Sequence, residues 1–213
     1  MPSFSFSQTT SPPMDSVNLI CLASTVVIAI VSSVLVTLSK AQAPSGRATK
    51  VEPFESDNAQ WYFDASMDIY CRKTGKAPDS LTEDDAEIIY GWASTHMAMF
   101  LTWAIMRGEA GTVHVEDEPQ ALQKVRLREM TGTEFLSRYC DCRLWKEDFS
   151  QDILPFVQQY YMQYLVDYPK FARGTLGKEE FSFPFSWEDY DAVQKFLDGK
   201  YARWKKKSGK GAG

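Results

Sequence analysis

The chain has 213 residues, of which 44% are hydrophobic and 14% aromatic, and it carries a formal net charge of -5. This length suits one folded domain with accessory segments, and the hydrophobic share excludes a wholly disordered chain. Residues 51–204 hold 27 of the 28 acidic residues but only 16 of the 23 basic ones. Such an acidic unit repels phosphate, so the composition argues against a nucleic-acid partner and favours a basic protein partner. A solvated surface that keeps the domain soluble is the plainer explanation.

An uncharged apolar run, VNLICLASTVVIAIVSSVLVTL, occupies residues 17–38. About 20 apolar residues cross a bilayer as a helix, so the run predicts a transmembrane helix. A cleaved signal peptide is the alternative, because Ala41-Gln42-Ala43 resembles a cleavage site, but no basic residue precedes the run. Basic residues follow it, which predicts a single-pass inner or plasma membrane protein with its C-terminal domain in the cytoplasm. These basic residues are Lys40, Arg47 and Lys50.

The four cysteines, at positions 21, 71, 140 and 142, agree with that placement. One lies in the apolar run, and the remaining three include a C-x-C pair, which is a poor disulfide framework. A reducing compartment is therefore expected.

Helical periodicity begins after Pro53. Asp57 predicts the N-cap of a helix to about Lys73, with Trp61, Ala65 and Ile69 on its buried face. A second helix, from about Thr82 to Arg107, is apolar on most sides and should be the most buried. Its inner stripe has the i, i+3, i+4 spacing of one helical face and consists of Ile89, Trp92, Ala93, His96, Phe100 and Trp103.

Further helices are predicted along the rest of the chain. Residues 108–119 should form a loop before a short helix, and Thr131 with Glu134 forms a capping box for the next one. Two more helices are predicted from about Ser150 and after Ser186. We therefore expect an all-α domain of about six helices, preceded by one transmembrane helix. The expected core contains Trp61, Trp92, His96, Phe100, Trp103, Phe135 and Tyr164. The predicted organisation is an extracytoplasmic N-terminus (1–16), a transmembrane helix (17–38), a linker (39–53), the all-α domain (54–204) and a basic disordered tail (205–213).

Four segments in order, DNAQW, THMAMFLTWAI, TGTEFLSRYCD and QQYYMQYLVDY, resemble a bacterial domain family of unknown function. That family carries Trp-His near its start, a His-x-Gly-Met-Phe-Leu-x-Trp-Ala helix and a Thr-Gly-x-x-Phe-Leu…Cys-Asp-Gly-Lys element. The resemblance covers nearly all of residues 54–204 and implies no activity. This chain departs from the pattern in three places, with Tyr62 in place of the first histidine, Ala98 in place of glycine and Cys142-Arg143 in place of Gly-Lys.

His96 is the first candidate for chemistry, because it lies on the apolar stripe of the long helix. A neutral core histidine, hydrogen-bonded to Asp141 or to a backbone carbonyl, is the expected structure. The alternative is a hydrolase with Cys140 or Cys142 as nucleophile, His96 as base and Asp141 orienting it, which requires hydrogen-bond reach between nucleophile and base. His114 lies among acids in a predicted loop and carries no pattern.

A metal site built from Cys71, Cys140, Cys142 and His96 matches zinc spacing poorly, so neither a metal nor a cofactor is expected. No phosphate-binding loop or other catalytic motif occurs. The leading hypothesis is therefore a membrane-anchored, cytoplasm-facing helical module that binds a basic protein, with an immunity or adaptor role as one form of it. Glu147, Asp148 and Asp152 are the candidate binding acids. The alternative is a hydrolase-like enzyme using His96 with Cys140 and Asp141.

Overall fold

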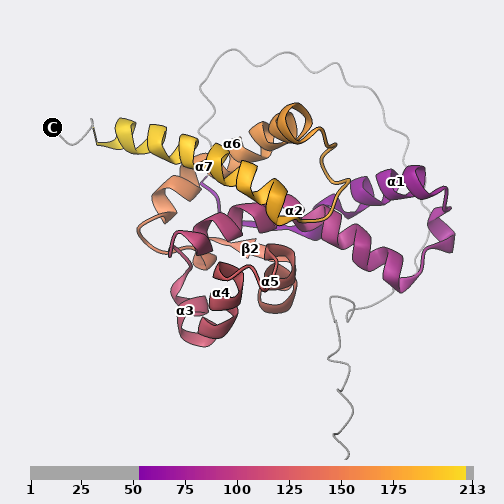
Figure 1. Cartoon of the computed structure of the whole chain (residues 1–213), viewed down its shortest axis with the longest axis horizontal. Coiled ribbons are helices and arrows are strands. Elements are labelled where there is room, and N and C mark those ends of the chain that lie inside the picture. Colours follow the sequence, from indigo (N-terminus) through magenta and orange to yellow (C-terminus); the bar gives the residue numbers. More distant parts are fainter. Residues whose placement is uncertain (1–52, 210–213) are drawn as a thin grey trace, which may run out of the picture. The chain divides into compact units, whose positions relative to one another are not determined.

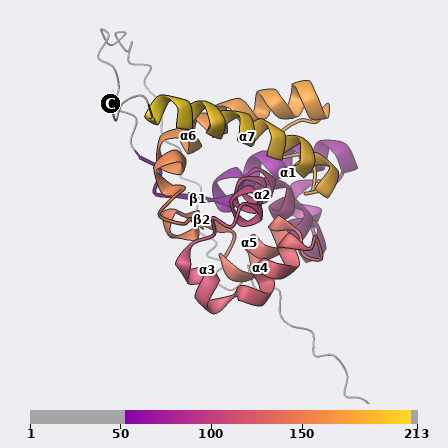
Figure 2. The same cartoon turned by 60° about the vertical axis from the view of Figure 1, so that its left-hand side comes forward.

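The computed structural model describes residues 53–209, shown in Figures 1 and 2. These residues form seven α-helices, a two-stranded sheet and several short helical turns. In chain order the elements are β1 (Ser56–Asn58), η1 (Ala59–Tyr62), α1 (Phe63–Thr74), η2 (Pro78–Ser80), α2 (Glu83–Met106), α3 (Thr112–Asp117), α4 (Pro119–Arg126), α5 (Gly132–Tyr139), β2 (Arg143–Trp145), η3 (Lys146–Asp148), α6 (Leu154–Phe171), η4 (Ala172–Leu176) and α7 (Trp187–Ser208).

The long helix α2 lies at the centre of the domain. A capping box starts it: the Thr82 hydroxyl accepts the Asp85 N–H, and the Asp85 carboxylate accepts the Thr82 N–H at 2.9 Å. Every residue from 93 to 105 is buried, as expected of a helix that is apolar on all sides. In both views α6 and α7 lie on one side of α2, and α3, α4 and α5 lie on the other (Figures 1 and 2). The prediction that this helix is buried is confirmed.

The all-α prediction missed a small antiparallel sheet. Strands β1 and β2 pair with Ser56 opposite Trp145 and Asn58 opposite Arg143. Strands of three residues are too short to show the alternation of polar and apolar residues that identifies a strand. The sheet holds the start of the domain against the segment that follows α5, so the fold is mostly helical with a two-stranded ribbon.

The first helix begins later than predicted. Asp57 lies in β1 and is 2% exposed, so it is not a helix N-cap; α1 starts at Phe63. Trp61, predicted in the core, is 65% exposed in the turn η1. The reason is that buried hydrogen bonds to the Asp57 carboxylate fix this segment, and they override the helical spacing of Trp61 and Ala65.

The two other boundary differences concern α3 and α7. Residues 112–117, predicted as loop, form the short helix α3. The last helix continues through Ser208, so Lys205, Lys206 and Lys207 belong to its final turn and not to a disordered tail. Cations in the last turn interact favourably with the helix dipole.

The membrane prediction is corrected by the structure. Within residues 53–209 no helix has the length and the apolar character needed to cross a bilayer. The predicted span, residues 17–38, lies outside the described residues. A preceding transmembrane helix, and with it the single-pass membrane placement that depended on it, is therefore not supported.

Helices α2 and α5 approach closely at Gly132. A Cβ added to this glycine would lie 2.1 Å from Thr102 Oγ1 and 2.8 Å from the Ala98 carbonyl oxygen. Real Cβ atoms do not come so close to backbone atoms, so the contact requires glycine at position 132. By contrast, a Cβ added to Gly199 in α7 meets nothing within 4 Å.

These two glycines give a matched test of the packing. Gly132→Ala should lower the free energy of unfolding by about 2 kcal/mol or more, because α5 must move away from α2. Gly199→Ala should raise it by about 0.5–1 kcal/mol through helix propensity. Urea denaturation of both variants measures the difference, and equal effects would contradict the close approach.

Candidate functional site

A buried carboxylate, Asp57, organises the polar centre of the domain. Its Oδ1 accepts hydrogen bonds from the Tyr62 hydroxyl at 2.8 Å and from the Asn58 N–H at 2.8 Å, and its Oδ2 accepts one from the Tyr161 hydroxyl at 2.7 Å. Burial acts to raise the pKa of Asp57, but His96 and the two tyrosines together hold that pKa below its ordinary value. Asp57 is therefore a charged group that needs these partners.

His96 lies on α2 beside this carboxylate. Its Nε2 is 3.4 Å from Asp57 Oδ2, a long polar contact without hydrogen-bond geometry, and within the described residues neither ring nitrogen has a hydrogen-bond partner. The prediction of a core position is confirmed by its 1% exposure, whereas the predicted hydrogen bond to Asp141 or to a backbone carbonyl does not form within the described residues.

Two aromatic side chains cover His96 from the outside. Tyr62 stacks on Phe181 with 5.0 Å between ring centroids, and both rings meet His96 edge to face, at 4.6 and 5.4 Å. Both are partly exposed, and Phe181 has a φ of 59°, a left-handed conformation that costs a bulky residue energy.

Glu180 lies beside this aromatic cover. Burial raises the pKa of Glu180 to about 7, although Arg173 acts in the opposite direction. Its charge also acts on the buried hydroxyl of Tyr168, whose oxygen has no hydrogen-bond partner within residues 53–209. Around His96, an acid with a raised pKa thus lies near polar atoms that have no hydrogen-bond partner within residues 53–209.

Removing the imidazole tests whether His96 is part of the core. His96→Ala should lower the free energy of unfolding by about 2–4 kcal/mol, because it opens a cavity beside the Asp57 carboxylate. Trp61→Ala, at an exposed aromatic, should change it by no more than about 0.5 kcal/mol. Thermal and urea unfolding measure both; an unchanged Tm for His96→Ala would contradict the core position.

The raised pKa of Glu180 predicts a pH-dependent stability difference. The folded chain keeps this proton up to a higher pH than the unfolded chain does, so the group costs stability progressively as pH rises from about 4.5 to 7. Glu180→Gln should therefore stabilise the protein at pH 8 relative to wild type, by about 1 kcal/mol after allowance for its partial exposure. Near pH 4 the two proteins should differ little in unfolding free energy. A difference that is the same at both pH values would contradict the burial effect.

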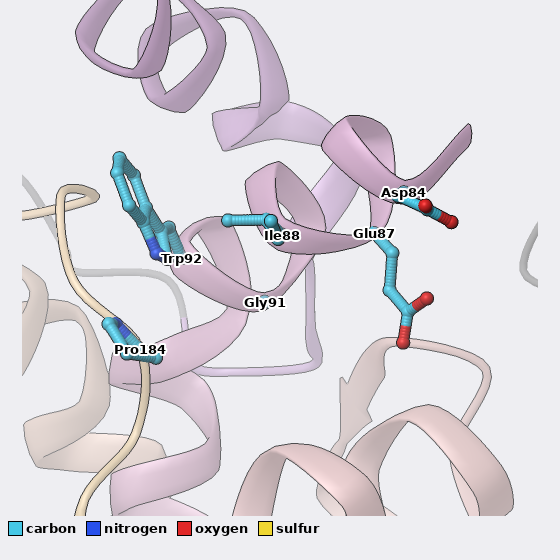
Figure 3. A pocket seen from close by; sticks show the side chains of 6 residues that line it. All are labelled: Asp84, Glu87, Ile88, Gly91, Trp92 and Pro184. Atoms are coloured by element: carbon cyan, nitrogen blue, oxygen red, sulfur yellow. The ribbon is translucent and has the colours of Figure 1, made fainter. Parts of the chain in front are cut away.

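A hollow of about 420 Å³ opens on the N-terminal half of α2 (Figure 3). Five of its six lining residues come from one face of the helix at i, i+3, i+4, i+7 and i+8, and the sixth is Pro184 from the loop before α7. The carboxylates lie toward the start of the helix, and Trp92 and Pro184 lie at the other end of the hollow (Figure 3). The five are Asp84, Glu87, Ile88, Gly91 and Trp92.

Both acidic and apolar side chains line the hollow. Within the described part of the chain, neither Asp84 nor Glu87 forms an ion pair, and Ile88 is 44% exposed. A Cβ added at Gly91 meets nothing within 4 Å, so no other described residue covers the helix backbone at this position. Trp92, predicted in the core, is partly exposed and packs with one edge on Tyr70.

A third cluster of polar side chains brings together residues from separate segments of the chain, and the sequence did not predict this cluster. His114 Nε2 lies 2.9 Å from Asp148 Oδ1 and 3.8 Å from Cys140 Sγ, and all three side chains are buried. Asp148 Oδ2 accepts the Trp145 N–H at 2.6 Å. Burial raises the pKa of the Cys140 thiol far above its ordinary value, and Asp148 adds to this effect.

The structure does not assemble the predicted catalytic trio. His96 faces Asp57, Cys140 lies against His114, and the Asp141 side chain is 71% exposed beside Arg143. Among the predicted binding acids, Glu147 and Asp152 are exposed, but Asp148 is buried because it bonds His114 and the Trp145 backbone. The sequence predicted no site at Asp57, His114, Glu180 or the hollow, although the helical hollow residues share one face by their i, i+3, i+4 spacing.

The fold and its sites define a mostly helical domain whose central helix has a buried polar centre and an open acidic face. Residues 55–182 match the family described as Domain of unknown function (DUF7832), so the chain belongs to this uncharacterised family. Comparisons with curated proteins and with solved structures found no match.

Proposed function

We propose that this chain is a protein-binding module that takes a basic, partly apolar segment of a partner protein in the hollow on α2. The observation that supports this most strongly is the exposed helix face itself. Apolar residues at i, i+4 spacing are normally covered in a folded domain, yet Ile88 and Trp92 remain accessible here. Exposed faces of this kind accept helices or extended segments of other proteins.

The carboxylates of Asp84 and Glu87 favour a partner segment with positive charge. Acids in the first turn of a helix are common because they interact favourably with the helix dipole, so Asp84 alone would mean little. Glu87 lies beyond the first turn, and neither acid is neutralised by an ion pair within residues 53–209. Because these acids lie beside the apolar side chains of Ile88 and Trp92, they favour a partner segment that contains both basic and apolar side chains.

The hydrolase alternative receives less support from the geometry. A nucleophilic cysteine must be available as thiolate, whereas burial raises the pKa of Cys140. A base also contacts its nucleophile through one ring nitrogen and its orienting acid through the other. Here Cys140 and Asp148 both approach Nε2 of His114, which is the wrong arrangement.

The family resemblance implies a bacterial origin. In a bacterial cell, a module that binds basic proteins would neutralise a basic toxin or link a basic protein to another component. This part of the proposal rests on the acidic composition of residues 51–204 and on the hollow. It does not depend on a membrane anchor.

The binding proposal can be tested by calorimetry with the full-length chain. The probe is a 12-residue peptide of alternating lysine and leucine, and its control has glutamate in place of lysine. The lysine peptide should bind and the glutamate peptide should not, and the affinity should fall as salt screens the charges. The double variant Asp84→Asn/Glu87→Gln should weaken binding by about tenfold or more.

Two further variants locate the site. Gly91→Leu places a side chain in the hollow at a position where an added Cβ meets nothing within 4 Å, so it should abolish binding while the helix stays intact. The matched control, Glu147→Gln/Asp152→Asn, removes two exposed acids elsewhere and should leave the affinity within about twofold. An equal loss in both double variants would contradict the hollow as the binding site.

A further inference from the structure

Three potential metal ligands from three separate elements converge inside the domain. His114 comes from α3, Cys140 caps the end of α5 and Asp148 ends the turn η3. One nitrogen, one sulfur and one oxygen atom of these side chains all lie within 4.8 Å of one another. We propose that His114, Cys140 and Asp148 form a binding site for a divalent transition-metal ion, with zinc as the preferred ion.

The direction of the contacts supports a metal site. Asp148 Oδ1 and Cys140 Sγ both approach Nε2 of His114, so the three donor atoms form one tight cluster. This arrangement is unsuited to a catalytic triad, which uses both ring nitrogens. A metal ion, in contrast, needs donors that meet at a single point.

The distances are compatible with zinc. Zinc bonds of about 2.0 Å to nitrogen or oxygen and 2.3 Å to sulfur place tetrahedral ligands roughly 3.3–3.6 Å apart. The observed separations are 2.9 Å for Nε2 to Oδ1 and 3.8 Å for Nε2 to Sγ. These two separations differ from tetrahedral values by a few tenths of an ångström, and the third pair, Oδ1 to Sγ, lies within 4.8 Å. Three protein ligands would leave a fourth position for water or another ligand.

The donor set and its surroundings also suit zinc. Thiolate, imidazole and carboxylate are its usual protein ligands, and a thiolate disfavours magnesium and calcium. The second oxygen of Asp148 is held by the Trp145 N–H, and the His114 ring packs edge to face on Phe135 at 5.1 Å. Such contacts orient metal ligands before the ion binds.

Cobalt(II) substitution in the full-length chain tests this proposal without any variant. A bound Co²⁺ with a thiolate ligand should give a sulfur-to-metal charge-transfer band and the strong visible bands of tetrahedral coordination, saturating at one ion per chain. Zn²⁺ should displace it and should raise the Tm of the chain. No charge-transfer band at stoichiometric Co²⁺ would overturn the proposal.

Variants then identify the ligands. Cys140→Ser should lose the charge-transfer band, whereas Cys142→Ser, at the neighbouring buried cysteine, should retain it. His114→Gln and Asp148→Asn should weaken metal binding by about tenfold or more. Circular dichroism confirms folding of each variant. A band that survives in Cys140→Ser or disappears in Cys142→Ser would assign the metal to other residues and overturn the site.

Discussion

Residues 93–105 of α2 are all buried, and this burial decides where the surrounding helices dock. Because residues 93–105 are surrounded, each polar group there needs a partner from a neighbouring element. Tyr164 of α6 donates to the His96 carbonyl at 2.8 Å, and the Trp103 indole donates to Asp198 of α7 at 3.0 Å. The Thr95 hydroxyl reaches the Phe183 carbonyl in the loop before α7. These bonds set where the surrounding helices lie.

The two ends of α2 have different surroundings, and this difference links the fold to the proposed function. Its C-terminal half is enclosed by α5, α6 and α7, whereas one face of its first turns borders solvent beside Pro184. The same helical spacing that buries Ala93 and Phe100 exposes Ile88 and the carboxylates of Asp84 and Glu87. Rigid anchoring of the buried half fixes the exposed face in one geometry, which lowers the entropy cost of binding a partner.

Local signals in the sequence were sufficient for much of the helical architecture. The Thr131–Glu134 capping box and the Ser186 cap are present as predicted, and so is the buried stripe through Phe100 and Trp103. The polar centres were not predictable in this way. Tyr161 and Asp57 are 104 residues apart, and His114 and Asp148 are 34 apart. Their pairing depends on how helices dock, and no periodicity within one helix reports it. The all-round apolar pattern of α2 also concealed that its first turns are open.

NMR tests most directly whether the open face of α2 is a docking surface. The signals of the tryptophan indole N–H groups are followed while the lysine–leucine peptide is added. The Trp92 signal should shift, because this ring lines the hollow. Trp103, buried and bonded to Asp198, should not move. A shift at Trp145, two residues before Glu147, with Trp92 unchanged would place the partner on another surface and contradict docking on α2.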